Sequence, residues 1–120
     1  MAVLDQLRKQ NLVPSPETVN ANWSTESASL DDRQGPFSLF IKYENGLSVN
    51  MVVQLEMSPT GESGDWAVVD DSERTITDSE GMVYYDVKDS GAQFIRISIV
   101  VTAGSIDVYE GEYSAFKAHQ

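Results

Sequence analysis

The side chains that most often carry out catalysis or bind metals are scarce in this sequence. Cysteine is absent, and the single histidine, His119, is the next-to-last residue. A catalytic triad built on His119 would need a rigidly held chain end, and chain ends are rarely held in that way. With no thiolate and one imidazole, the usual ligands of a transition-metal site are missing. The many carboxylates include no pair that stands out as acid and base, so we predict that the protein is not an enzyme.

One acidic loop has the composition of a cation site. Asp70, Asp71 and Glu73 lie close together, and Asp78 and Glu80 follow soon after. Hard cations such as calcium favour oxygen clusters of this kind. The spacing matches no EF-hand loop, and a solvated acidic loop explains the same residues. We therefore expect no cofactor, with calcium near this loop as the minor alternative.

Aromatic side chains offer a second kind of site. Trp66, Tyr84 and Tyr113 would stack on sugar rings if they lay exposed on one face. In small β proteins such rings more often fill the core or its ends. An exposed row would favour a carbohydrate-binding module, whereas buried rings would favour a purely structural role.

The charge of the chain limits its partners. The sequence has 8 basic and 19 acidic residues, which gives a net charge of −11. This field repels nucleic-acid phosphates and anionic lipid headgroups. No apolar run approaches the roughly 20 residues that span a bilayer, and the N-terminus lacks the apolar core of a secretory signal. We expect a chain made in the cytoplasm, with no nucleic-acid and no membrane partner.

The elements that must position these side chains have the alternation of β-strands. Residues 94–102 place Ile95, Ile97 and Ile99 on one side and polar residues on the other. The 120 residues suit one domain. Roughly seven or eight such segments predict an antiparallel β-sandwich of jelly-roll or related topology, with a bulge at Gly111. The main predicted strands are 37–43, 48–58, 66–69, 82–87, 94–102 and 106–115, with turns at 44–46 and 103–105.

The N-terminal segment differs from the rest of the chain. Three of its aliphatic residues would share one face of a short helix, which two prolines would end. Such a helix is too short to be stable alone and needs a surface. We predict an arm at 1–18, short-helical and then extended, outside a β-sandwich domain at 19–120. The aliphatic residues expected to bind a partner from this arm are Val3, Leu4, Leu7, Leu12 and Val13.

Two apolar residues interrupt the polar faces of predicted strands. Phe40 lies between Ser38 and Lys42 on the outer side of the strand 37–43. Met82 has a similar position at the start of a later strand. An exposed apolar side chain of this kind is a candidate contact with a partner or with a second copy of the chain. A homo-oligomer such as a trimer is therefore expected.

The order of strands and turns from Phe37 onward forms a recognisable pattern. Its parts are FSLFIKY, MVVQLEMSPTGESGDW, YYDVKDSGAQFIRISIVVTAGS and IDVYEGEYSAFKA. This pattern resembles the small β-sandwich virion proteins of tailed bacteriophages, which include head decoration or cement proteins and fibre-type modules. The resemblance covers about two thirds of the chain and contains no catalytic motif. It implies a component of the virion with a binding or stabilising role.

Three functions are consistent with these observations. The first is a capsid decoration or cement protein that binds the major capsid protein and stabilises the assembled head, with its arm contacting neighbouring subunits. The second is a tail, neck or fibre module bound to other virion proteins. The third, from a different class, is a carbohydrate-binding module.

Overall fold

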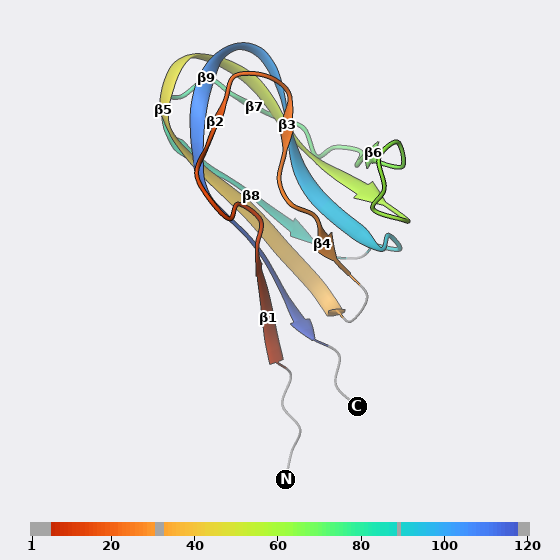
Figure 1. The fold of residues 1–120 in the computed structure, drawn as a ribbon. Coiled ribbons are helices and arrows are strands. Elements are labelled where there is room, and N and C mark those ends of the chain that lie inside the picture. The colour runs from red at the N-terminus through yellow and green to blue at the C-terminus, as the bar shows by residue number, and fades with distance from the viewer. Residues whose placement is uncertain (1–5, 31–32, 89, 118–120) are drawn as a thin grey trace.

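A computed structural model describes residues 6–30, 33–88 and 90–117, and every regular element in that part of the chain is a β-strand. The strand pairs are antiparallel and join into one sheet of nine strands. Figure 1 shows that this sheet curls over itself into a half-barrel. The predicted all-β, antiparallel fold is confirmed. The predicted sandwich of two sheets is not confirmed, because the two layers are halves of one curled sheet.

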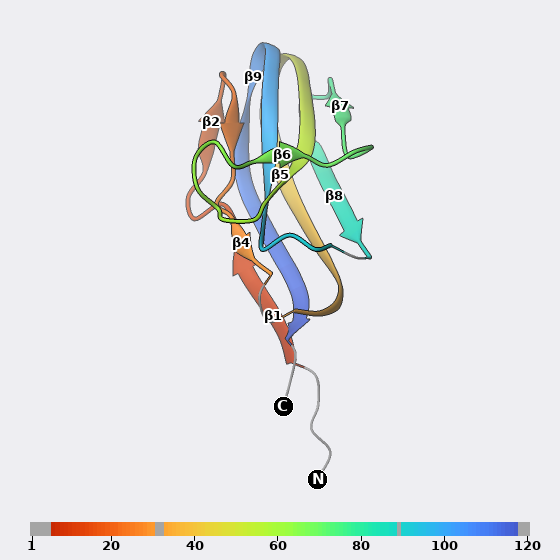
Figure 2. The same ribbon diagram turned by 90° about the vertical axis from the view of Figure 1, so that its right-hand side faces the viewer.

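Two long strands form the centre of the sheet. β5 (Arg33–Ser58) and β9 (Phe94–Lys117) pair with each other along almost their full lengths. Short strands line the outer edge of each of them (Figure 2). The edge of β9 holds β1 (Gln6–Asn11), β2 (Glu17–Val19), β3 (Trp23–Ser24) and β4 (Ala28–Ser29). The edge of β5 holds β6 (Ala67–Val68), β7 (Arg74–Ile76) and β8 (Gly81–Val87).

The predicted turns at 44–46 and 103–105 bend the long strands and do not reverse them. The two segments face each other across the β5–β9 pair, with Leu47 opposite Ser105, and the register shifts on both sides of that position. Asn45 and Gly104 have φ angles of 57° and 81°. Positive φ angles occur in β-bulges as well as in hairpin turns. Four predicted strands therefore merge into two bent ones.

A polar network fixes this bend from one side. The Asp107 carboxylate accepts hydrogen bonds from Asn45 Nδ2 at 2.9 Å and from Thr18 Oγ1 at 2.8 Å. These two bonds hold the pKa of Asp107 below its usual value, because they favour the charged form. The network joins β2, β5 and β9 at the point where the sheet curls.

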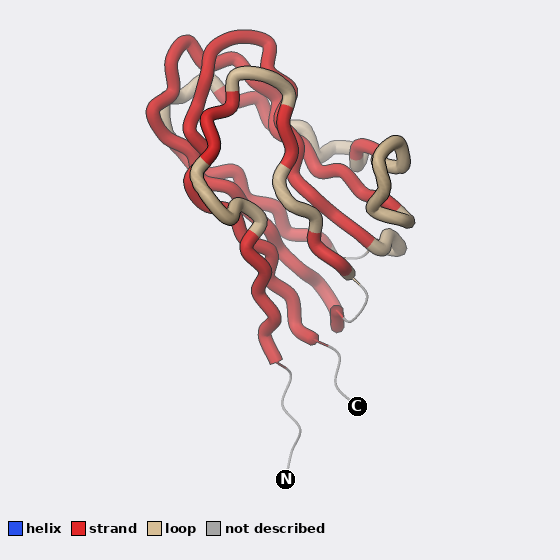
Figure 3. Tube along the Cα trace, in the orientation of Figure 1, coloured by secondary structure: helices blue, strands red, loops and turns tan. Residues whose placement is uncertain are grey.

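The core lies inside the curl. The predicted alternation of the strands 37–43, 48–58 and 94–102 is confirmed, because their apolar sides are buried. Both halves of the bent sheet contribute to the same cluster, which explains how a single sheet encloses a core. Figure 3 shows the strands surrounding this space. Fully buried members include Leu39, Ile41, Met51, Val53, Ile95, Ile97, Ile99, Ile106 and Val108.

The described part of the N-terminal segment belongs to the sheet. The predicted short helix is wrong, because β1 pairs with the end of β9. Leu12 and Val13 are 0% and 4% exposed and lie in the core. The Leu12 N–H donates a hydrogen bond to Gly111 O at 2.9 Å. The predicted domain boundary between residues 18 and 19 falls inside β2.

The predicted bulge lies two residues before its expected position. Lys42 pairs with Glu110 and Tyr43 with Val108, so the extra residue is Tyr109. Gly111 itself is regularly paired, and a Cβ there would stand 2.7 Å from Val13 Cγ2. The glycine therefore allows the N-terminal segment to pack closely on β9.

One buried hydroxyl predicts how stability depends on alkaline pH. Tyr85 is 4% exposed, and its Oη lies 2.7 Å from Ser72 O and 3.0 Å from Val53 O, to which it can donate. Burial raises the pKa of Tyr85 to about 12, although the nearby Arg74 guanidinium lowers it. The unfolded chain loses this proton near pH 10, whereas the folded chain keeps it. The free energy of unfolding should therefore fall by roughly 2–3 kcal/mol between about pH 10 and pH 12.

Chemical denaturation from pH 9 to pH 12 measures this decline. Tyr85→Phe should make it shallower, because phenylalanine has no proton to lose. Some decline should remain, since burial, assisted by the Asp78 charge, also raises the pKa of Tyr43. Tyr109→Phe, at an exposed position, serves as the matched control and should leave the decline as it is. Equal slopes for Tyr85→Phe and the wild type would contradict the prediction.

Candidate functional site

A partly buried ion pair organises the outer face of the sheet beyond the bend. Arg96 Nε donates to Glu56 Oε1 at 2.9 Å, which joins β9 to β5. The Arg96 guanidinium also lies 4.1 Å from the centroid of the Trp66 ring. The side chains of Arg96 and Glu56 are only 25% and 16% exposed, so this ion pair is well shielded from solvent. Arg96 is thus held between a carboxylate and an aromatic ring.

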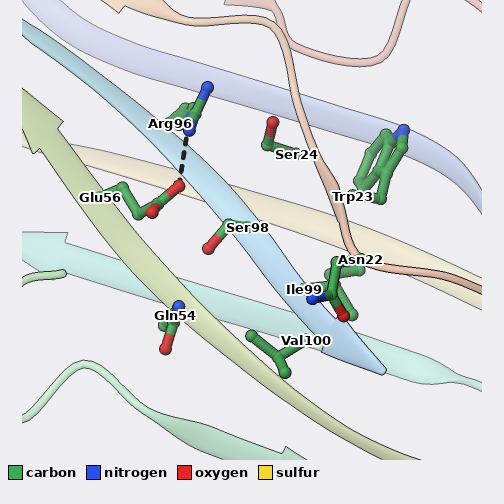
Figure 4. A pocket seen from close by; sticks show the side chains of 9 residues that line it. All are labelled: Asn22, Trp23, Ser24, Gln54, Glu56, Arg96, Ser98, Ile99 and Val100. Atoms are coloured by element: carbon green, nitrogen blue, oxygen red, sulfur yellow. Dashed lines mark hydrogen bonds and ion pairs between the residues drawn. The ribbon is translucent and has the colours of Figure 1, made fainter. Parts of the chain in front are cut away.

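A hollow of about 510 Å³ opens beside this ion pair (Figure 4). One wall comes from the segment that contains β3, and the other walls come from β5 and β9. Asn22 is fixed in this position because its Oδ1 accepts a hydrogen bond from Val101 N–H at 2.9 Å. The lining residues are Asn22, Trp23, Ser24, Gln54, Glu56, Arg96, Ser98, Ile99 and Val100.

Ser98 is the unusual residue of this hollow. It lies on the polar side of the alternating strand, where sequence reasoning expects solvent. The structure buries it to 8% exposure, because β3 lies alongside and places Ser24 opposite Ser98. Its Oγ has no hydrogen-bond partner among the described residues. No sequence signal marked this serine, since its burial depends on a segment more than seventy residues away.

A second surface lies on the outer side of β5 and β8, and we call it the β5–β8 face. Phe40 is opposite Tyr84, and Lys42 is opposite Met82. Met82 and Tyr84 are 55% and 48% exposed, and Phe40 is half-buried. Lys42 Nζ lies 5.8 Å from the centroid of the Phe40 ring and 3.8 Å from Glu110 Oε2. The face is therefore an apolar stripe of Phe40, Met82 and Tyr84 with charged residues beside it.

The partner-binding residues predicted from the sequence do not lie together on one surface. Phe40 contributes to the β5–β8 face, whereas Leu12 and Val13 are core residues that a partner could reach only if the fold opened. Val3 and Leu4 lie outside the described residues. Leu7 forms part of β1, but its side chain is also outside the described part.

The three rings considered as an alternative sugar-stacking row do not all lie exposed on one face. Tyr113 is 1% exposed and packs against Phe37, with ring centroids 5.6 Å apart. Trp66 is half-buried, and Arg96 lies over its ring. Tyr84 is exposed, but it belongs to the β5–β8 face. Tyr113 is therefore a core residue, as the favoured reading of these rings expected.

The acidic loop has no geometry that favours a cation. Within the described residues, no three histidine, cysteine or acidic side chains gather as metal ligands, and Asp70, Asp71 and Glu73 are all exposed. Arg74 already donates hydrogen bonds to the backbone oxygens of Asp71 and Glu73, both at 3.1 Å. The calcium hypothesis stays a prediction from composition. In the same part of the chain, no helix is long and apolar enough to cross a membrane.

Comparison with known proteins reveals the fold and no family. No protein-family model matches the sequence, and no curated protein is significantly similar to it. The solved structure of the SPBc2 prophage-derived protein YomS aligns with 96% of this chain and 98% of its own, at a TM-score of 0.55 and 14% identity. The enzymatically active domain of bacteriophage CBA120 tailspike protein 4 aligns with 96% of this chain, at a TM-score of 0.56 and 12% identity. This chain corresponds to 18% of that tailspike chain, and the fold is thus one that phage-derived proteins share.

Proposed function

We propose that this chain is a non-catalytic structural protein of a bacteriophage particle, and that it decorates the assembled head. The observation that carries this proposal is the β5–β8 face. Met82 and Tyr84 are large apolar residues, and each leaves about half of its surface in water on one strand. Contiguous apolar groups with a charged rim are typical of protein-binding surfaces.

The chemistry of the face supports a particular kind of partner. Glu110 and Glu112 are near neighbours of the stripe, since Phe40 pairs with Glu112 and Lys42 with Glu110. The net charge of −11 opposes close packing of free copies. A capsid surface with an apolar centre and basic groups around it would complement both features. Several copies, arranged as a trimer or another symmetric oligomer at lattice positions, would then reinforce one another.

We assign the contact with the shell to the sheet and not to the N-terminal arm. The arm hypothesis relied on exposed aliphatic residues, and two of them, Leu12 and Val13, are core residues. Burial in the core already satisfies their hydrophobic surface. The β5–β8 face keeps its apolar groups in water and has no such competing role.

A tail module is the second candidate, and one observation favours it. The same fold occupies 18% of a bacteriophage tailspike domain, where it is one part of a longer chain. A module of that kind would bind other tail proteins through the same face. The two candidates differ in the part of the particle that is bound.

Binding to particles that lack the protein tests the proposal. The wild-type protein should bind heads saturably at lattice stoichiometry. The double variant Met82→Ser/Tyr84→Ser should lose at least about tenfold in affinity, because it removes the apolar anchors. Leu47→Ser is the matched control, since Leu47 is 69% exposed and lies away from the face at the bend.

Each outcome decides between the candidates. Binding only to isolated tails would replace head decoration with the tail module. No binding to heads or tails, or equal binding by the double variant and the wild type, would overturn the role of the β5–β8 face. Circular dichroism should show that both variants keep the sheet.

A further inference from the structure

We propose that the hollow beside the Glu56–Arg96 pair binds a neutral saccharide. The hollow is distinct from the β5–β8 face, because it lies on the part of the sheet beyond the bend. Its volume of about 510 Å³ falls within the range of roughly 300–1,000 Å³ that small-molecule sites occupy. Three chain segments that are distant in sequence form its walls (Figure 4).

The first argument is the unsatisfied hydroxyl of Ser98. A hydroxyl that is more than nine-tenths buried normally has a hydrogen-bond partner. Ser98 Oγ has none among the described residues, and Ser98 is one of the residues that line the hollow. A ligand hydroxyl in the hollow would supply the missing bond.

The second argument is the group of polar side chains around Ser98. Ser24 and Gln54 line the same hollow, and Figure 4 draws no hydrogen bond between them and the other lining residues. The Glu56–Arg96 contact uses Oε1 and Nε, which leaves Glu56 Oε2 and the terminal guanidinium nitrogens for a ligand. The hollow thus offers hydroxyl, amide, carboxylate and guanidinium groups close together.

This mixture identifies the class of ligand. Sugar hydroxyls donate and accept at once, so they match a site in which donors and acceptors alternate. An anionic ligand would meet the Glu56 carboxylate and the net charge of −11. A cationic ligand would meet the Arg96 guanidinium. A neutral polyol avoids both repulsions.

The walls of the hollow are already in place. Arg96 is held between Glu56 and the Trp66 ring, and Asn22 is held by the Val101 N–H. β3 is joined to β9 by the pairing of Trp23 with Ile99. A site of this kind needs little ordering when a ligand binds, which favours affinity.

The experiment screens neutral oligosaccharides that contain glucose, galactose or mannose against the full chain. Binding at millimolar concentration or tighter is expected, with amide chemical-shift changes in NMR spectra confined to residues 22–24, 54–56 and 96–100. Ser98→Ala should weaken binding at least about fivefold, the equivalent of one lost hydrogen bond. It should leave the melting temperature unchanged, because the wild-type hydroxyl has no partner to lose.

A second variant and a control keep the test sharp. Gln54→Ala should weaken binding to a similar degree, and Glu110→Gln, on the other side of the bend, should bind like the wild type. The proposal is overturned if no neutral oligosaccharide binds, if only acidic glycans bind, or if the shifts lie elsewhere. Wild-type affinity in both hollow variants would also overturn it. None of these results changes the expected binding of Met82→Ser/Tyr84→Ser to particles, so the two proposals fail independently.

Discussion

Replacing Gly104 with alanine should lower the free energy of unfolding by roughly 3 kcal/mol or more. Two causes add together at this position. The φ angle of Gly104 is 81°, which a residue with a side chain adopts only with strain. A Cβ there would also stand 2.3 Å from the backbone oxygens of Leu47 and Ser48, so the opposite strand would have to move. Urea denaturation followed by tryptophan fluorescence measures the loss.

Gly64→Ala separates the two causes. Gly64 has a φ angle of 91° and nothing within 4 Å of the position of a Cβ. It should therefore cost only the strain of the backbone angle, about 1–2 kcal/mol. If Gly104→Ala lowered the free energy of unfolding no more than Gly64→Ala, this result would contradict the close approach of β5 and β9 at the bend.

The expected loss of stability in Gly104→Ala is large because the bend couples the two long strands. β5 and β9 curl together, so a displacement of one strand at Leu47 also displaces its partner. The core is enclosed only because the two halves of the sheet face each other. A local clash at Gly104 therefore acts on the packing of the whole core.

Replacing Leu12 with alanine should destabilise the protein by about 2–5 kcal/mol. Leu12 is fully buried, and its removal would leave a cavity between the N-terminal segment and the sheet. The thermal midpoint should fall accordingly. Leu47→Ala is the same change at a residue that is 69% exposed, and it should alter stability by less than about 0.5 kcal/mol.

This comparison also tests the architecture of the N-terminus. If residues 1–18 were an arm outside the folded domain, Leu12→Ala would cost as little as Leu47→Ala. In that case the aliphatic residues of the arm would again be available for binding to a capsid. A large difference between the two variants would instead establish the segment as part of the core.

Much of the fold follows from the sequence alone. The period of two in residues 94–102 predicts which side chains are buried, because neighbouring side chains on a strand point to opposite faces. Ile95, Ile97 and Ile99 are accordingly in the core. The same reasoning marked Phe40 and Met82 as residues on an outer face, and they share the β5–β8 face. These features are local, so the sequence pattern is sufficient to predict them.

The candidate site was far less predictable. Ser98 has the pattern of a solvent-facing residue, and only the β3 segment, which arrives from the N-terminal part of the chain, buries it. Arg96 and Glu56 have no motif between them, yet pairing of β5 with β9 places them side by side. A site assembled from three separate segments leaves no fixed spacing in the sequence.

The sequence by itself determined the all-β class, the buried sides of the long strands, the acidic charge and the absence of thiol chemistry. The tertiary structure decided whether a turn signal reverses the chain or bends it, and whether a short apolar segment is a helix or a strand. Asn45 and Gly104 take positive φ angles that suit either outcome, and the pairing of the two segments across β5 and β9 selects the bend. Residues 6–11 are too short to stabilise a helix alone, and the open edge of β9 supplies the backbone hydrogen bonds that make them a strand. In both cases a partner distant in sequence settles the conformation.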